Sequence, residues 1–199
     1  SDTGNGGASV VGAYQISVGT DTSYFDYGFG TGTWGTSTWG TPRTGVQVET
    51  LNARIWHFDN FGQVLLLQLV DGELYQWNPS DGVDTRATLV SGAPTKNGYM
   101  LVSSPDRHLI AFGTETTIGD PDTQDPLFVR FSDQEDINTF VESVTNTAGG
   151  QRLSDGNRIQ TAVRARGQIL VLTDTSLHGM QYIGPPYTFG FQQLGSNCG

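Results

Sequence analysis

The sequence predicts an all-β fold, on the strength of its composition, its turn signals and a recurring strand pattern. Glycine accounts for 27 of the 199 residues, and aromatic residues make up 11% of the chain. This bias is typical of short strands joined by tight turns. Charged residues make up only 15%, below the roughly 25% usual in soluble domains. We therefore expect neither long solvated helices nor charge-driven disorder.

From about residue 45 onward, the chain shows a repeated strand pattern. The Asp71-Gly72 pair lies between two β-rich runs, which predicts a hairpin with a type I′ turn. The break at 78–82 then ends this unit's third strand. The first unit is therefore a three-stranded meander with a candidate fourth strand, and its expected strands are 53–58, 63–70, 73–77 and 87–90.

Two further units repeat this pattern. Gly62-Gln63-Val64-Leu65 and Gly167-Gln168-Ile169-Leu170 occupy the same place in the first and third units. In the second unit, a loop at 113–126 delays the return strand. The expected strands are 99–103, 108–112 and 127–131 in the second unit, and 159–165, 168–173 and 177–182 in the third.

A repeat of this size, with three or four strands, indicates a β-propeller blade. One small sheet cannot bury both of its faces alone, whereas stacked sheets can. Propellers typically need at least four blades. The prediction is therefore a partial or irregular β-propeller of three to four antiparallel meander blades, with a β-sandwich as the alternative. The blades are expected at about 53–91, 98–146 and 158–194 within residues 45–199, and the propeller is expected to continue in a longer chain.

Residues 1–44 form a distinct segment rich in glycine, threonine and aromatic residues, interpreted as an arm or an irregular blade. The run Thr33–Thr36 is repeated at Thr38–Thr41, which places Trp34 and Trp39 five residues apart. In one interpretation these tryptophans cover the edge of the following core. In the other, they anchor a neighbouring subunit, because tryptophan is favoured at interface hot spots.

One helix is expected, after the second unit. The run Ser132–Glu135 matches a capping box, and its acidic residues suit a helix N-terminus. We expect one or two helical turns here, ended by the residues at 146–150.

The charge balance excludes several functions. Twenty acidic residues against ten basic ones give a net charge of −10, which argues against DNA binding through phosphate neutralisation and against a basic membrane patch. No stretch reaches the roughly 18 apolar residues of a membrane span. The single cysteine, Cys198, excludes an internal disulfide and a multi-cysteine zinc site.

The sequence shows no motif of an enzyme or a cofactor site, so we predict neither. Its three histidines, His57, His108 and His178, fall in different units without metal-ligand spacing. No nucleophile elbow, phosphate loop or dinucleotide fingerprint is present. We likewise predict no metal site. Three carboxylates form a weak Ca²⁺ candidate, namely Asp120, Asp122 and Asp125. Their loop lacks the glycine and the distal glutamate of an EF-hand.

Arginines and tryptophans are the candidate interaction residues. Arg164 and Arg166 are expected on one strand face. In a chain of net charge −10, salt bridges between blades or subunits are the favoured interpretation of such arginines. The candidates are Trp34, Trp39, Trp77, Arg164 and Arg166.

Several long and specific motifs occur in the chain, at 104–113, 130–136, 149–156, 166–177 and 182–191. The most specific of them runs from a strand through Thr-Asp-Thr-Ser-Leu to a Gly-Pro-Pro turn. As a set, these motifs resemble those of tailed-bacteriophage virion proteins of the tail hub or nozzle type, a group that includes proteins described as stabilising packaged DNA. The resemblance covers most of residues 30–199, and the proteins that the chain resembles are larger.

The resemblance implies a non-enzymatic propeller in a ring-shaped tail assembly. Its expected partners are further copies of itself and other tail proteins, and its expected location is the virion, after synthesis in the bacterial cytoplasm. DNA would pass nearby without being bound specifically, since an acidic channel repels phosphates. The alternatives are a tail-tip module that binds a glycan or receptor through Trp34, Trp39 or Trp77, and a glycosidase on the same scaffold.

Overall fold

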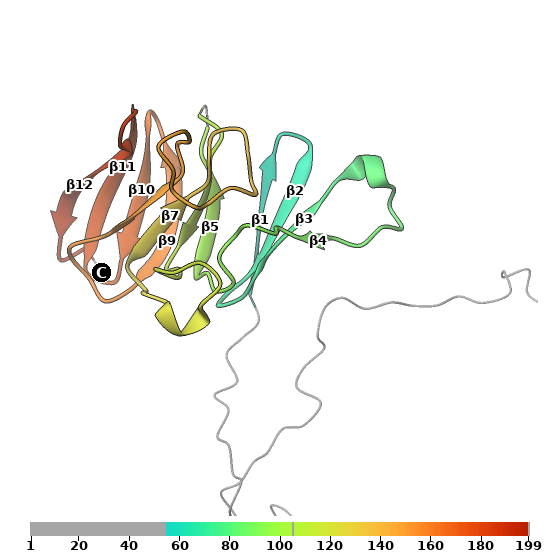
Figure 1. Cartoon of the computed structure of the whole chain (residues 1–199). Coiled ribbons are helices and arrows are strands. Elements are labelled where there is room, and N and C mark those ends of the chain that lie inside the picture. The colour runs from blue at the N-terminus through green and yellow to red at the C-terminus, as the bar shows by residue number, and fades with distance from the viewer. Residues whose placement is uncertain (1–54, 105, 199) are drawn as a thin grey trace, which may run out of the picture. The chain divides into compact units, whose positions relative to one another are not determined.

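The computed structural model describes residues 55–104 and 106–198, and the predicted all-β fold is confirmed there. The described residues contain three four-stranded antiparallel sheets and two short 3-10 helices (Figure 1). The N-terminal arm with Trp34 and Trp39 lies outside the described residues. Neither helix in the described part of the chain is long and apolar enough to span a membrane.

Each sheet is a simple meander in which sequential strands are neighbours. Sheet I contains β1 (Trp56–Phe61), β2 (Val64–Leu69), β3 (Leu74–Trp77) and β4 (Thr88–Leu89), with helix η1 (Pro79–Asp81) before β4. Sheet II contains β5 (Tyr99–Val102), β6 (Leu109–Phe112), β7 (Phe128–Phe131) and β8 (Gly149–Arg152), with helix η2 (Pro121–Thr123) between β6 and β7. Sheet III contains β9 (Ile159–Ala165), β10 (Gln168–Thr173), β11 (Ser176–Gly184) and β12 (Thr188–Ser196).

The turns explain why the chain reverses where it does, but two expectations about them are wrong. Gly62 opens the two-residue loop between β1 and β2, whereas Gly167 closes the corresponding loop between β9 and β10. Both glycines have positive φ, at 65° and 81°. The sequence alignment of the two units is therefore one residue out of register, and a one-residue slip exchanges the two faces of a strand.

The hairpin at Asp71-Gly72 forms, but its turn lies one residue earlier than expected. The Gly72 amide donates to the Leu69 carbonyl at 2.8 Å, and Asp71 adopts the left-handed conformation with φ 58°. Gly72 instead pairs with Asn97 in an isolated bridge. The predicted type I′ geometry, which needs left-handed conformations at both residues, is therefore wrong.

The expected helix at the capping box is also absent from the described residues. Glu135 is left-handed, with φ 62°, which an α-helix does not accommodate. Ser132 serves the sheet instead, because its hydroxyl accepts from the Leu109 amide at 2.9 Å. Gly149 and Gly150, at the expected helix end, begin strand β8, which lies wholly beyond the expected blade limit at residue 146.

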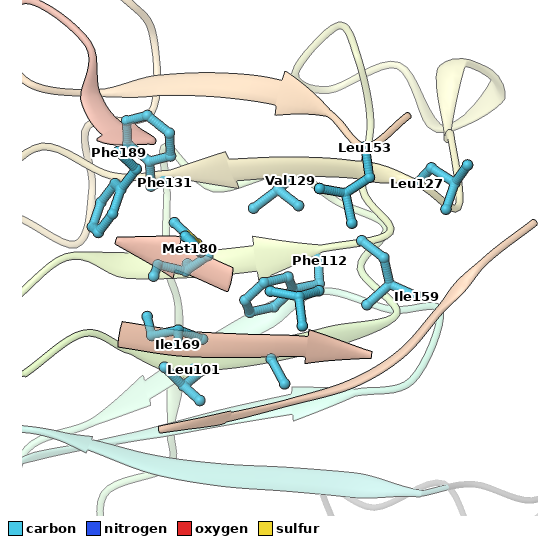
Figure 2. Close-up of a cluster of buried hydrophobic side chains, with 13 residues drawn as sticks. Leu101, Phe112, Leu127, Val129, Phe131, Leu153, Ile159, Ile169, Met180 and Phe189 are labelled. Atoms are coloured by element: carbon cyan, nitrogen blue, oxygen red, sulfur yellow. The ribbon is translucent and has the colours of Figure 1, made fainter. Parts of the chain in front are cut away.

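Sheet II lies between sheets I and III, and an apolar cluster fills each junction. Alternation along β5 and β6 sends Leu101, Ile110 and Phe112 to one face and Met100 and Leu109 to the other. The II–III cluster (Figure 2) contains Leu101, Ile110, Phe112, Leu127, Val129, Phe131, Leu153, Ile159, Ala162, Ile169, Val171, Met180 and Phe189. The I–II cluster contains Phe61, Leu66, Leu74, Val90, Met100, Val102, Leu109, Ala111, Ile137 and Phe140.

The first strands of the three sheets also lie beside one another, β1 against β5 and β5 against β9. The fold therefore stacks three meanders, and the last strand of each is followed in the chain by the first strand of the next.

Candidate interaction surface

The face of sheet I that points away from sheet II carries large apolar side chains. Cross-strand pairing places Phe58, Leu67, Tyr75 and Leu89 in one row across the four strands. Phe58 is 61% exposed and Leu89 is 46% exposed. We call this surface outer face I, and it consists of Trp56, Phe58, Leu65, Leu67, Leu69, Tyr75, Trp77 and Leu89.

Trp77, a predicted interaction residue, belongs to outer face I. It pairs with Leu65 at the end of the sheet, and its indole N–H donates to the Thr85 carbonyl at 2.9 Å. That bond ties Trp77 to the loop of η1, which projects away from sheets II and III in Figure 1. The indole is thus held in place at the margin of the exposed apolar face.

Sheet III presents a similar surface on the side away from sheet II. Ile183 and Leu194 lie over glycines of the neighbouring strands: a Cβ on Gly190 would be 3.3 Å from Ile183, and one on Gly179 would be 3.1 Å from Leu194. Val163, Ile183 and Leu194 are 52%, 56% and 46% exposed. We call this surface outer face III, and it consists of Thr161, Val163, Leu170, Leu172, Leu177, Ile183 and Leu194, together with Gln168, Gln181 and Gln192.

The two outer faces are apolar surfaces of the kind that marks sites of protein association. Scattered exposed hydrophobic residues are ordinary on a protein surface. Here they are contiguous, since cross-strand neighbours have Cβ atoms about 4.5–5.5 Å apart. The stack of sheets therefore ends in an apolar face at each side.

Arg164 connects the first strands of all three sheets. From β9, its Nε donates to the Val102 carbonyl of β5 at 2.7 Å, and its guanidinium forms an ion pair with Asp59 of β1. Asp59 also accepts from the Val102 amide at 2.8 Å. The salt bridge is a tie between sheets within the chain, which is the role favoured for this arginine from the sequence.

The sequence predicts Arg164 and Arg166 on one strand face, and this prediction is wrong. Arg166 lies in the two-residue turn between β9 and β10, where its side chain is exposed. Among the described residues it forms no ion pair. Arg166 is therefore free for contact with another molecule, whereas Arg164 is engaged.

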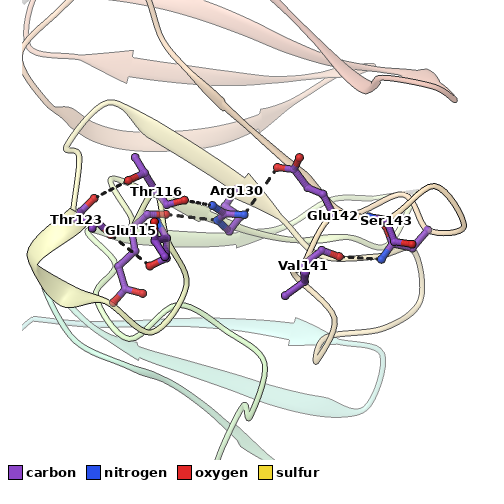
Figure 3. Close-up of polar contacts among 9 residues, drawn as sticks. Glu115, Thr116, Thr123, Arg130, Val141, Glu142 and Ser143 are labelled. Atoms are coloured by element: carbon purple, nitrogen blue, oxygen red, sulfur yellow. Dashed lines mark hydrogen bonds and ion pairs between the residues drawn. The ribbon is translucent and has the colours of Figure 1, made fainter.

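A buried arginine that the sequence analysis missed fixes the long loop of sheet II (Figure 3). Arg130 of β7 donates to the Thr116 carbonyl at 2.7 Å and to the Glu115 carbonyl at 3.4 Å. Burial lowers its pKa, while the carboxylates of Glu142 and Glu115 act in the opposite direction. The ion pair with Glu142 measures 3.8 Å.

Glu115 is fully buried, and its carboxylate closes the same loop. It accepts from the backbone amides of Lys96 at 2.9 Å and Gly119 at 2.7 Å, and from both the amide and hydroxyl of Thr95. A carboxylate with this many donors is satisfied without water. Arg130 and Glu115 are therefore structural residues, and a charge within an otherwise apolar strand was the one signal available for Arg130.

The three carboxylates of the weak Ca²⁺ candidate do not converge. Asp120 caps η2 by accepting from the Asp122 amide, and Asp125 binds Arg152 at 2.6 Å and the Leu127 amide at 2.9 Å. Among residues 55–104 and 106–198, no three His, Cys, Asp or Glu side chains are grouped to hold a metal ion. The carboxylates of Asp120 and Asp125 thus bind protein groups of their own neighbourhood.

The three histidines are separate, each with local partners. His57 packs edge-on against Tyr99, with ring centroids 4.5 Å apart, and burial lowers its pKa. His108 is fully buried with Nδ1 2.8 Å from the Ser132 carbonyl, and His178 Nε2 lies 2.9 Å from the Ser176 hydroxyl. Within the described residues they do not form a shared site.

A scan of the chain against protein-family models finds no match, and a search of curated proteins finds none either. A function is therefore inferred from the two outer faces and from the contacts between the sheets.

Proposed function

We propose that the chain is a non-enzymatic structural component of a phage virion tail, in a hub or nozzle ring, and that its three sheets are consecutive blades of an open β-propeller. One observation carries the architectural part of the proposal. Three sequential meanders stack with their first strands side by side, and the stack ends in an apolar face at each side.

The order of strands supports a propeller over a sandwich. In a propeller, each blade is a four-stranded meander whose first strand lies nearest the axis. The neighbouring positions of β1, β5 and β9 fit that arrangement. A β-sandwich has two packed sheets, whereas sheet II packs against a sheet on both of its faces.

The location of the motifs that resemble tail proteins supports a structural role. The motif at 166–177 runs from the turn after β9 through β10 to the start of β11, and the motif at 182–191 covers the turn between β11 and β12 with the adjoining ends of both strands. Ile169, Val171 and Phe189, which belong to these motifs, pack in the II–III cluster. These motifs therefore contribute to packing between the proposed blades and to turn geometry, as expected of a structural protein.

The charge distribution refines the proposed path of DNA. Of the charged side chains on the strands proposed to lie nearest the axis, Asp59 of β1 and Arg164 of β9 pair with each other, and β5 has none. The acidic excess of the described residues lies on connecting loops, including 113–127 and 132–147. DNA passing such an axis would meet a wall without net charge on these strands, and therefore no basic surface to retain it.

Purified virions provide the test of the virion role. An antibody raised against the chain should label one end of the tail in electron micrographs, and tryptic peptides from the chain should appear in virion digests. Particles that lack tails serve as the matched control and should remain unlabelled. Absence of the chain from intact virions would overturn the proposal.

The glycan-binding alternative rests on the aromatic rings of outer face I, including Trp77. The two functions differ in what removing an indole does. A glycan array on which the chain bound one sugar class, with binding lost in Trp77→Ala and kept in a Trp77→Phe variant, would favour the receptor-binding module.

A further inference from the structure

We propose that the two outer faces bind each other between copies of this chain, so that outer face I of one copy packs on outer face III of the next. This inference deepens the proposed function and rests on its blade architecture. It requires nothing of the virion location.

The internal junctions show the contact that the outer faces would repeat. Each sheet has one face toward the sheet before it in the chain and one face toward the sheet after it. Sheet II packs the first of these faces on sheet I and the second on sheet III. Outer face I is the face of sheet I that would lie toward a preceding sheet. Outer face III is the face of sheet III that would lie toward a following sheet. A contact between them therefore continues, from copy to copy, the packing used twice within the chain.

The two faces are matched in chemistry. Each is built on four antiparallel strands and carries leucines in its centre: Leu65 and Leu67 on face I, and Leu170 and Leu172 on face III. Both have more exposed apolar side chains at the margin, such as Phe58 at 61% and Ile183 at 56%. An apolar centre with a more accessible rim is the usual anatomy of a protein interface.

The charges around the faces favour unlike faces over like ones. Apart from Asp59 and Arg164, which pair with each other within the chain, residues 55–97 carry four acidic and two basic side chains, and residues 153–198 carry two arginines and two aspartates. Contact between two copies of face I would bring two net negative segments together, whereas contact between faces I and III avoids this repulsion. Exposed Arg166 and Arg158 of sheet III form no ion pair among the described residues.

A contact between unlike faces leaves one free face on each member of a pair, so the same contact can be repeated. Repetition closes into a ring when the rotation per copy allows it, and otherwise extends as a filament. The predicted assembly therefore grows beyond a dimer, which separates it from an association of two identical faces.

Two substitutions test the contact, one on each face. Phe58→Asp places a charge on outer face I, and Val163→Asp places one on outer face III, where the replaced side chains are 61% and 52% exposed. We expect the unmodified chain to grow in mass with concentration in analytical ultracentrifugation. Each variant alone should remain monomeric, with self-association weakened on the order of tenfold or more.

The decisive measurement is an equimolar mixture of the two variants. Phe58→Asp retains outer face III and Val163→Asp retains outer face I, so the mixture should form a one-to-one dimer and nothing larger. Dimers of either variant alone would show contact between identical faces, and a monomeric unmodified chain at all concentrations would show no contact. Either result overturns the proposal.

Controls separate a lost contact from a lost fold. Val144→Asp adds the same charge at a fully exposed valine outside both faces, and should associate like the unmodified chain. Circular dichroism and thermal unfolding check each variant, and Leu89→Asp and Ile183→Asp replace any variant that unfolds. A monomeric chain that is still found in virion tails would refute this inference alone, whereas head-to-tail association of a chain absent from virions would refute the virion role alone.

Discussion

Sheet II and the two terminal sheets differ in burial although their strands have similar sequences. In β6 of sheet II, all four residues of Leu109–Phe112 are buried, since apolar neighbours cover both faces. In β2 of sheet I, the run Val64–Leu69 is apolar except for Gln68, yet from Leu65 onward its side chains alternate between partly exposed and buried. A strand that is apolar on both faces is typical of a sheet covered on both sides. Strand β2 thus resembles a strand of a central sheet, although only one face of sheet I is covered by another sheet in the described residues.

The largest expected difference between the regions is the cost of removing a phenyl ring. Phe112 is fully buried in sheet II, so Phe112→Ala should lower the free energy of unfolding by about 3–5 kcal/mol. Phe58 on outer face I is 61% exposed, so Phe58→Ala should change it by less than about 1 kcal/mol. Urea denaturation of dilute protein measures both.

A large effect of Phe58→Ala at low concentration, where association is absent, would contradict this comparison. The ring would then be packed within the single chain, and outer face I would already be covered.

Glycines sharpen the comparison at an intermediate scale. A Cβ on Gly149 of β8 would lie 2.7 Å from the Phe131 ring, which is itself held in the II–III cluster. Gly149→Ala should therefore cost about 1–3 kcal/mol, as overpacking does. Gly179→Ala on outer face III meets the flexible ends of Gln168 and Leu194 at 3.0 and 3.1 Å, and should cost less.

Thermal unfolding of the two alanine variants side by side checks this difference. Equal losses would show that outer face III is packed as tightly as the interior of sheet II.

These glycines also show where the sequence was and was not informative. Strong local signals predicted most strands, and Ile159–Ala165 and Gln168–Thr173 were predicted with their observed limits. Strand β8 was missed because Gly149 and Gly150 are typical of a chain break. They form a strand because the rings of Phe131 and Phe128 lie over them and leave no room for a side chain, and that contact is long-range.

The candidate site was predictable to a similar extent. Trp77 and Arg164 were chosen for residue type and spacing, and the structure places Trp77 on an outer face and Arg164 between sheets. Outer face I as a surface could not be predicted, because the sequence of β2 does not show which neighbour is absent. The register error between Gly62 and Gly167 arose because the sequence does not show whether a two-residue loop has its glycine first or second.

Arg164 and Arg166 provide a matched pair with a smaller expected effect. Arg164→Ala removes the contacts with Asp59 and Val102, and leaves the largely buried Asp59 carboxylate without its counterion. Because the guanidinium is partly exposed, we expect a loss of only about 1 kcal/mol. Arg166→Ala should change the free energy of unfolding by less than about 0.5 kcal/mol.

Chemical denaturation at low and high salt distinguishes the two arginines. The effect of Arg164→Ala should shrink only partly at high salt, since the bond to the Val102 carbonyl is not an ion pair. Equal effects of the two substitutions would show that the tie between the sheets contributes nothing measurable.

The smallest expected effect concerns two aspartates in loops of sheets II and III: Asp133 lies between β7 and β8, and Asp174 lies between β10 and β11. Burial raises the pKa of Asp133, but hydrogen bonds from Thr147 and Gln134 outweigh it and lower the pKa overall. Hydrogen bonds from the amide and side chain of Asn157 lower the pKa of Asp174. Each carboxylate thus binds its proton more weakly in the folded chain than in the unfolded one.

The sign of the pH dependence follows from this depression. Each aspartate contributes its stabilisation above the unfolded pKa of about 3.9 and loses it as the pH falls through the lower folded value. The free energy of unfolding of the unmodified chain should therefore fall between about pH 5 and pH 2 more steeply than that of Asp133→Asn or Asp174→Asn. At the acid end of the range the curves should converge, since the carboxyl is then protonated in both states. Curves that stay parallel throughout would show that these hydrogen bonds do not distinguish the folded from the unfolded chain, and a convergence confined to Asp133→Asn would place the acid-sensitive contact in sheet II alone.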